Sequence, residues 1–271
     1  MKTNFNLKKY NTFGIDCFCD NFLEIKKEQD LFDFLKTKPK KVLFLGNGSN
    51  ILFTKDFSGT VIYSNIKKIQ EIKKTLPIVL MDNISSDKSI PSVTIDNFNS
   101  SSKCAEYLIS LGHKQIAFVS GLLDSDICKE RLSGYLNILN KYNIKKDDKL
   151  IFKGDYSFES GEKAARYFLS LTQKPTAIMF ANDSMAIGAM KVIQENKLNI
   201  PKDISIVGFD DIDVASRVFP PLTTIAAPIA KMIEKAVQIL IQEINGHSQD
   251  YQHIILPADL VIRNSCASPK K

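Results

Sequence analysis

Residues 174–190, KPTAIMFANDSMAIGAM, contain an apolar run that passes directly into polar residues and then into an amphipathic stretch. The run TAIMFA is continuously apolar, as expected for a strand that is buried on both faces of a parallel sheet. From residue 184 the apolar residues recur at the spacing of one helix face. The polar residues at the junction can cap the first turn of that helix. The stretch therefore predicts a strand that leads directly into a helix.

The same alternation of strand-length and helix-length patterns extends from about residue 20 to residue 245. The predicted strands are NFLEI, KVLFL, TVIYS, PIVLM, SVTID, QIAFVS, LIFKG, TAIMFA and ISIVGF. The predicted helices include SSSKCAEYLISLG, ICKERLSGYLNILNKY, SGEKAARYFLSL, SMAIGAMKVIQENK and IAKMIEKAVQILIQEI. The C-terminal HIILPADLVIR reads as short strands. This order predicts an α/β fold with open parallel sheets and crossover helices on both faces.

Polar residues follow four of the predicted strands where each strand ends, in AFVSG, FKGDYS, MFANDS and VGFDDI. In an open parallel sheet, ligands bind outside the carboxyl ends of the strands. The convergence of several such ends predicts a cleft for a small polar ligand. The alternative is that Asp183, Asp210 and Asp211 only cap the helices that follow, which explains any one of them equally well.

The composition indicates a globular protein, because 44% of the 271 residues are hydrophobic and 24% are charged. No apolar run reaches the length of a bilayer span and the N-terminus lacks a secretory signal pattern, so we expect a cytoplasmic protein without a membrane partner. The five scattered cysteines predict neither a disulfide framework nor a metal site. The net charge of +6 comes from lysine pairs interleaved with acids, which indicates a solvated surface. No helix-turn-helix or zinc-finger pattern is visible, so direct sequence-specific DNA binding is not expected.

From about residue 75 to residue 266 the chain resembles the effector-binding core of the LacI/GalR family of bacterial transcription regulators, in particular its catabolite control protein A branch. The segments that carry this resemblance are IPSVTIDN, LGHKQIAFVSG, ERLSGY, GDYSFESG, KPTAIMFANDSMAIGAM, NIPKDISIVGFDD, PPLTTI and LVIRNSC. The resemblance implies a periplasmic-binding-protein-like core of two subdomains that binds a sugar-like effector. It also implies a homodimer, which we expect to be weak and to form through the C-terminal subdomain.

The resemblance also implies ligand-binding roles for five residues. Arg131 matches an arginine that donates to ligand oxygens, for which its planar fork of donors is suited. Tyr156 matches an aromatic residue that packs on the ligand. Asn182 and Asp210 match polar residues that hydrogen-bond to sugar hydroxyls. Asp82 ends the strand that lies across the cleft and is a weaker candidate. His113 matches a structural position rather than a catalytic one.

The N-terminal part departs from this family, because the DNA-binding head and the first strands of its N-terminal subdomain have no counterpart. Residues from about 7 to 68 instead resemble the N-terminal part of UDP-N-acetylenolpyruvoylglucosamine reductase, a flavin enzyme of peptidoglycan precursor synthesis. Two motifs carry this resemblance: Asn11-Thr12-Phe13-Gly14 and Gly46-x-Gly48-Ser49-Asn50. Glycine pairs make ordinary turns, yet they also let backbone N–H groups approach a phosphate. The resemblance implies that Asn11, Thr12, Gly46, Gly48, Ser49 and Asn50 once held FAD.

No second flavin-binding segment follows, so we expect that the chain binds no cofactor and is not an enzyme. The chain reads as a chimera or fusion of two partial sequences, with residues 1–68 as the reductase-like fragment and residues 69–271 as the regulator core. We expect KVLFL to lie beside PIVLM in one sheet, which would give the core a hybrid N-terminal subdomain. Three interpretations remain: a module that binds a sugar-like effector, an FAD-dependent reductase remnant that is inactive because its other segments are missing, and a folded scaffold without a ligand.

Overall fold

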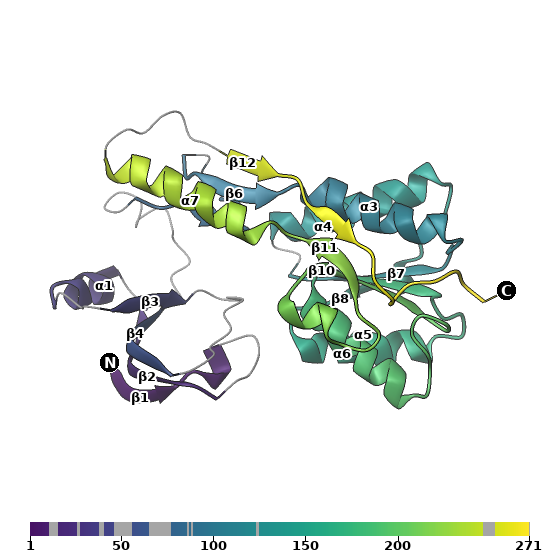
Figure 1. Cartoon of the computed structure of the whole chain (residues 1–271), viewed down its shortest axis with the longest axis horizontal. Coiled ribbons are helices and arrows are strands. Elements are labelled where there is room, and N and C mark those ends of the chain that lie inside the picture. Colours follow the sequence, from purple (N-terminus) through teal and green to yellow (C-terminus); the bar gives the residue numbers. More distant parts are fainter. Residues whose placement is uncertain are drawn as a thin grey trace. The chain divides into compact units, whose positions relative to one another are not determined.

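The chain forms two compact units, Met1–Leu76 and Pro77–Lys271 (Figure 1). The computed structural model describes residues 1–10, 16–25, 28–37, 41–45, 56–64, 77–85, 87, 89–122, 125–245 and 253–270. The division that we expected from the sequence, between residues 68 and 69, falls a few residues before the boundary between the units.

The first unit contains a four-stranded sheet in the order β1-β2-β4-β3. Its elements are β1 (Lys2–Asn6), β2 (Phe18–Ile25), α1 (Glu28–Leu35), β3 (Val42–Leu45) and β4 (Phe57–Ser64). Strands β2, β4 and β3 are parallel, whereas β1 is antiparallel to β2. Buried side chains of β2 and β4 form its core, among them Phe22, Val61 and Ile62. The predicted strands NFLEI, KVLFL and TVIYS all lie in this sheet.

The expectation that KVLFL lies beside PIVLM is wrong. KVLFL forms β3, which pairs with β4, and β4 also pairs with β2 along its other edge. PIVLM contributes only the short strand β5 (Leu80–Met81), which pairs with β6 (Ser92–Ile95) in a different sheet. β4 supplies a hydrogen-bonding partner and buried apolar residues to both β2 and β3. The strands of the first unit therefore form a separate sheet that does not include PIVLM.

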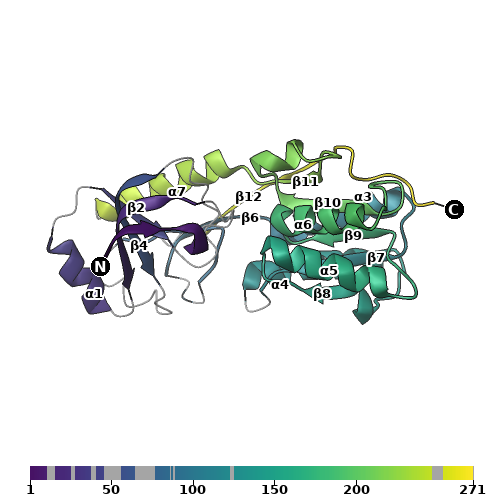
Figure 2. The ribbon, with the colours of Figure 1, turned by 90° about the horizontal axis from the view of Figure 1, so that it is seen from below.

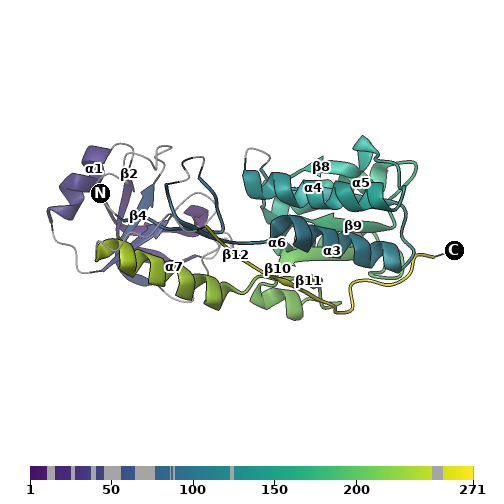
Figure 3. The same cartoon turned by 90° about the horizontal axis from the view of Figure 1, so that it is seen from above.

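The larger lobe of the second unit is built on a six-stranded sheet in the order β13-β11-β10-β9-β7-β8. Its strands are β7 (Ile116–Ser120), β8 (Ile151–Lys153), β9 (Ala177–Phe180), β10 (Ser205–Asp210), β11 (Thr223–Ala226) and β13 (Asp259–Val261). All pairs are parallel except β11 with β13. One face carries α3 (Asn97–Ser110) and α4 (Asp126–Lys141), and the other carries α5 (Phe158–Ser170) and α6 (Asp183–Glu195), as Figures 2 and 3 show from opposite sides.

The smaller lobe of the second unit contains the parallel three-stranded sheet β12-β6-β5, with β12 at His253–Leu256, and the helix α7 (Ile229–Ile244) packed on it. The described chain passes between the two lobes after β6, after β11 and after β12. The α/β fold with parallel sheets and helices on both faces is therefore confirmed. Two strands, β1 and β11, have no counterpart among the predicted ones.

Candidate functional site

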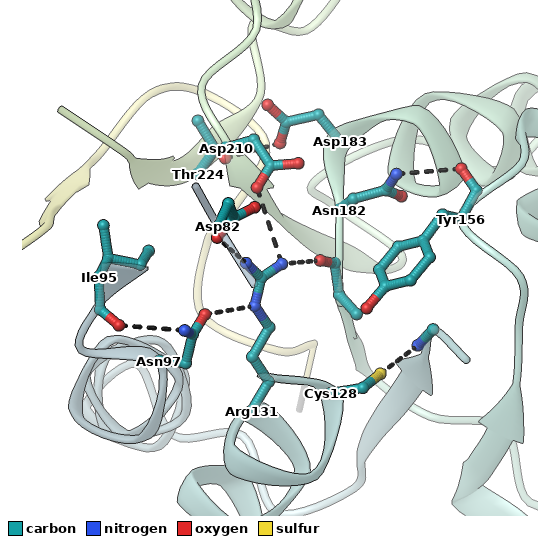
Figure 4. Close-up of polar contacts among 12 residues, drawn as sticks. Asp82, Ile95, Asn97, Cys128, Arg131, Tyr156, Asn182, Asp183, Asp210 and Thr224 are labelled. Atoms are coloured by element: carbon teal, nitrogen blue, oxygen red, sulfur yellow. Dashed lines mark hydrogen bonds and ion pairs between the residues drawn. The ribbon is translucent and has the colours of Figure 1, made fainter. Parts of the chain in front are cut away.

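Arg131 lies on α4 and directs its guanidinium toward the carboxyl ends of β9 and β10 (Figure 4). Its side chain is only 3% exposed. Nε donates to Oδ1 of Asn97 at 2.8 Å, and Nη1 donates to the carbonyl oxygen of Ala181 at 2.5 Å. The guanidinium carbon stands 3.7 Å from the centre of the Phe209 ring. The five N–H donors of an arginine lie in one rigid plane. The contacts with Asn97 and Ala181 therefore fix the directions of the remaining N–H groups.

Two carboxylates face the guanidinium from different lobes. Oδ1 of Asp210, at the end of β10, lies 3.7 Å from Nη1, and Oδ1 of Asp82, just after β5, lies 4.0 Å from Nη2. Asp210 is 16% exposed and Asp82 is 43% exposed. Burial raises the pKa of Asp210 well above its usual range, although the charge of Arg131 acts in the opposite direction. The site therefore combines one buried cation with two acids that belong to separate sheets.

Backbone strain concentrates at this site. Among the described non-glycine residues, seven have a positive φ, and four of those are Asp82, Tyr156, Asp210 and Asp211. The φ angles of Asp82, Tyr156 and Asp210 are 50°, 69° and 110°. Such conformations cost free energy and persist where the surrounding structure holds them, often at binding sites. Three of these four residues, Asp82, Tyr156 and Asp210, are among the five that the sequence singled out as ligand contacts.

Asn182 and Tyr156 lie beside Arg131 and are tied to each other (Figure 4). Asn182 caps α6, because its Oδ1 accepts from the backbone N–H of Met185 at 3.0 Å. Its Nδ2 donates to the carbonyl oxygen of Tyr156 at 3.0 Å. The ring of Tyr156 packs so closely on Gly121 that a Cβ there would lie 2.1 Å from the ring. Burial raises the pKa of the Tyr156 phenol, so it acts as a neutral hydrogen-bonding group.

The capping alternative does not describe the three aspartates. Asn182, not Asp183, caps α6. Asp183 is fully buried and accepts from the hydroxyl of Thr224 at 2.6 Å and from the backbone N–H of Ile212 at 2.9 Å. Asp211 forms an ion pair with Arg263 at 2.7 Å. Asp183 and Asp211 therefore join elements of the larger lobe, while Asp210 faces Arg131.

Asp183 should make the stability of the protein depend on pH. Burial raises its pKa to about 7 in the folded protein, above the usual value near 4 in an unfolded chain. The folded state then holds this proton more tightly, so the free energy of unfolding should fall as pH rises from about 4 to about 7. We expect Asp183→Asn to lose this part of the slope, in urea unfolding at pH 5 and pH 7.5. The exposed Asp213→Asn is the control, and an unchanged slope in Asp183→Asn would contradict the prediction.

Asn97 is a residue of this site that the sequence analysis did not select. It follows the predicted strand SVTID directly, so the rule that polar residues at strand ends form the site could have found it. His113 has a structural place, because its ring nitrogens lie 2.8 Å from the hydroxyl of Thr176 and 2.9 Å from the carbonyl oxygen of Ala267.

The residues that were expected to hold FAD, Asn11, Thr12, Gly46, Gly48, Ser49 and Asn50, lie outside the described residues. In the part of the chain that the structure describes, no cluster of three or more histidine, cysteine or acidic side chains could hold a metal ion. All five cysteines are free. None of the helices in the described ranges has the length and apolar character needed to cross a membrane.

Comparison with known proteins matches residues 105–266 to the family model of the periplasmic binding protein-like domain. The transcriptional repressor CytR of Escherichia coli K12 is 32% identical over 220 residues, which are 80% of this chain and 64% of CytR. Catabolite control protein A of Priestia megaterium is 34% identical over 221 residues, 80% of this chain and 67% of that protein. The chain thus spans slightly less than two thirds of the length of CytR.

A regulatory protein of the LacI family from Chloroflexus aggregans has a solved structure with the same fold. It superposes with a TM-score of 0.71 at 30% identity, over 88% of this chain and 82% of that one. These relatives are transcription regulators rather than enzymes, in agreement with the expectation that this chain is not an enzyme.

Proposed function

Because this chain belongs to the periplasmic-binding-protein-like domains of LacI-type transcription regulators, we propose that its second unit binds a small sugar-like effector between its two lobes. The observation that carries this proposal is the position of Arg131, whose guanidinium faces Asp210 in the larger lobe and Asp82 in the smaller one. A ligand that contacts all three groups would hold the two lobes together.

The chemistry of these groups suits hydroxyl groups. A hydroxyl can accept from the guanidinium of Arg131 and donate to a neighbouring carboxylate, so it satisfies both charged partners. The cap and the contact with Tyr156 use the carbonyl oxygen and one N–H of Asn182, which leaves its second N–H for a ligand oxygen. The ring of Tyr156 offers an apolar face against which a sugar ring could pack.

Regulation of transcription is a further part of this proposal. An effector changes a regulator only if it binds one arrangement of the lobes more tightly than another. We infer that effector binding to this unit regulates transcription in the cytoplasm, and that the unit pairs as a weak homodimer. Gel filtration with light scattering at several concentrations tests the pairing.

A thermal melt against a panel of compounds tests the binding function directly. The panel contains free sugars, sugar phosphates, purines and FAD. A compound that binds only the folded state raises the melting temperature by mass action. We therefore expect a single cooperative transition whose melting temperature rises with one sugar-like compound. A rise with FAD instead would favour the reductase interpretation. A melt that no compound moves would overturn the effector proposal in favour of a scaffold without a ligand.

A further inference from the structure

Asn97 occupies the segment through which the chain passes from the smaller lobe into the larger one. This crossing segment, residues 95–97, contains the last residue of β6, the cap residue Asp96 and the first residue of α3. The side chain of Asn97 is fully buried. A buried amide must hydrogen-bond through both of its ends, so its partners show what it holds together.

The two ends of this amide contact different parts of the site (Figure 4). Its Nδ2 donates to the carbonyl oxygen of Ile95 at 3.0 Å, on the last residue of β6. Its Oδ1 accepts from Nε of Arg131 at 2.8 Å. One side chain therefore joins the end of a strand in the smaller lobe to the arginine that faces both carboxylates.

The crossing segment is also tied to its surroundings on either side. The backbone N–H of Asp96 donates to the carbonyl oxygen of Leu256 at 3.0 Å, at the end of β12, where the chain crosses between the lobes again. The hydroxyl of Ser101, one turn into α3, donates to the carbonyl oxygen of Arg131 at 2.6 Å. A change in the backbone at residues 95–97 would therefore affect both α4 and the crossing between the lobes that follows β12.

We propose that Asn97 is a positioning residue that couples the crossing segment between the lobes to the guanidinium of Arg131. With Nε held by Asn97 and one N–H of Nη1 held by Ala181, the remaining donors of Arg131 face Asp82 and Asp210. A movement of the lobes that turns Asn97 also turns these donors. The coupling is reciprocal, so a change at Arg131 alters the crossing segment. The role of Asn97 in the response to an effector rests on the proposed function above.

Hydrogen exchange of the Asp96 amide tests this coupling without any effector. Exchange is followed by NMR in wild type, Arg131→Lys, Asn97→Ala and the double variant, with Asn137→Ala on the exposed face of α4 as the control. Arg131→Lys keeps the charge but has no Nε, so we expect it to accelerate this exchange about fivefold or more. In the Asn97→Ala background the same change should add nothing. Equal acceleration in both backgrounds, or none in either, would overturn the proposal.

A second variant guards against a loss of folding. Asn97→Asp keeps an acceptor for Arg131 but cannot donate to the carbonyl oxygen of Ile95. We expect the Nε–H resonance of Arg131 to persist in this variant while the Asp96 amide exchanges faster. Loss of the Arg131 resonance, or wild-type exchange at Asp96, would contradict the coupling. Because none of these measurements uses a ligand, a failure of the coupling is distinct from a failure of the panel to find an effector.

Discussion

Arg131→Ala should weaken binding of the compound found in the thermal panel by about 10- to 150-fold, because a hydrogen bond to a charged group contributes about 1.5–3 kcal/mol. The substitution should also lower the free energy of unfolding by a few kcal/mol. The oxygen atoms of Asn97 and Ala181 that accept from the guanidinium would lose their buried donor, and leaving a buried acceptor unsatisfied costs about 1–3 kcal/mol. Titration calorimetry measures the first effect and urea unfolding measures the second.

Two further variants separate binding from folding. Arg131→Lys keeps the positive charge but loses the planar fork, so we expect intermediate affinity. Arg166→Ala makes the same side-chain change at an exposed position of α5, where 57% of the side chain is accessible, and should alter neither affinity nor stability much. Unchanged affinity in a folded Arg131→Ala protein would show that the ligand does not contact this guanidinium.

The fold of the larger lobe was predictable because its central strands are continuous apolar runs that are buried on both faces. β11 was missed because half of its four residues are threonines. These threonines are buried through partners far along the chain: the hydroxyl of Thr224 donates to Asp183, and that of Thr223 accepts from the backbone N–H of Arg263. Apolar periodicity cannot reveal such partners, since they depend on which segments meet in the folded chain.

The candidate site was predictable to the extent that polar residues at strand ends converge. This rule and the family resemblance selected Asp210 and Asn182, and the structure brings both to Arg131 or its neighbours. The sequence predicted a cap at the start of α6 but did not select Asn182 among the polar residues there. The link from Asn97 to Arg131 could not be foreseen, because it depends on the direction of two side chains. The pairing of KVLFL was missed for a related reason: an apolar run predicts a strand but does not select its neighbour.

Gly161→Ala should destabilise the second unit although alanine favours helix formation. Gly161 on α5 faces the backbone of α6, and a Cβ there would lie 1.9 Å from the carbonyl oxygen of Met185. Gly188 on α6 meets α5 in the same way, with a Cβ 2.1 Å from the carbonyl oxygen of Phe158. The two helices thus cross with backbone against backbone, and neither can yield by rotating a side chain.

The helix propensity gained by Gly161→Ala is about 1 kcal/mol, whereas overpacking of a close contact costs about 1–3 kcal/mol or more. Because the obstacle is backbone rather than a flexible side chain, we expect the upper end of that cost and a net loss of about 2 kcal/mol in urea unfolding. Lys163→Ala, on the exposed face of the same helix, introduces the same side chain without the contact and should be neutral or slightly stabilising. Equal stability of the two variants would contradict this prediction, because it would mean that α5 and α6 can move apart at no cost in free energy.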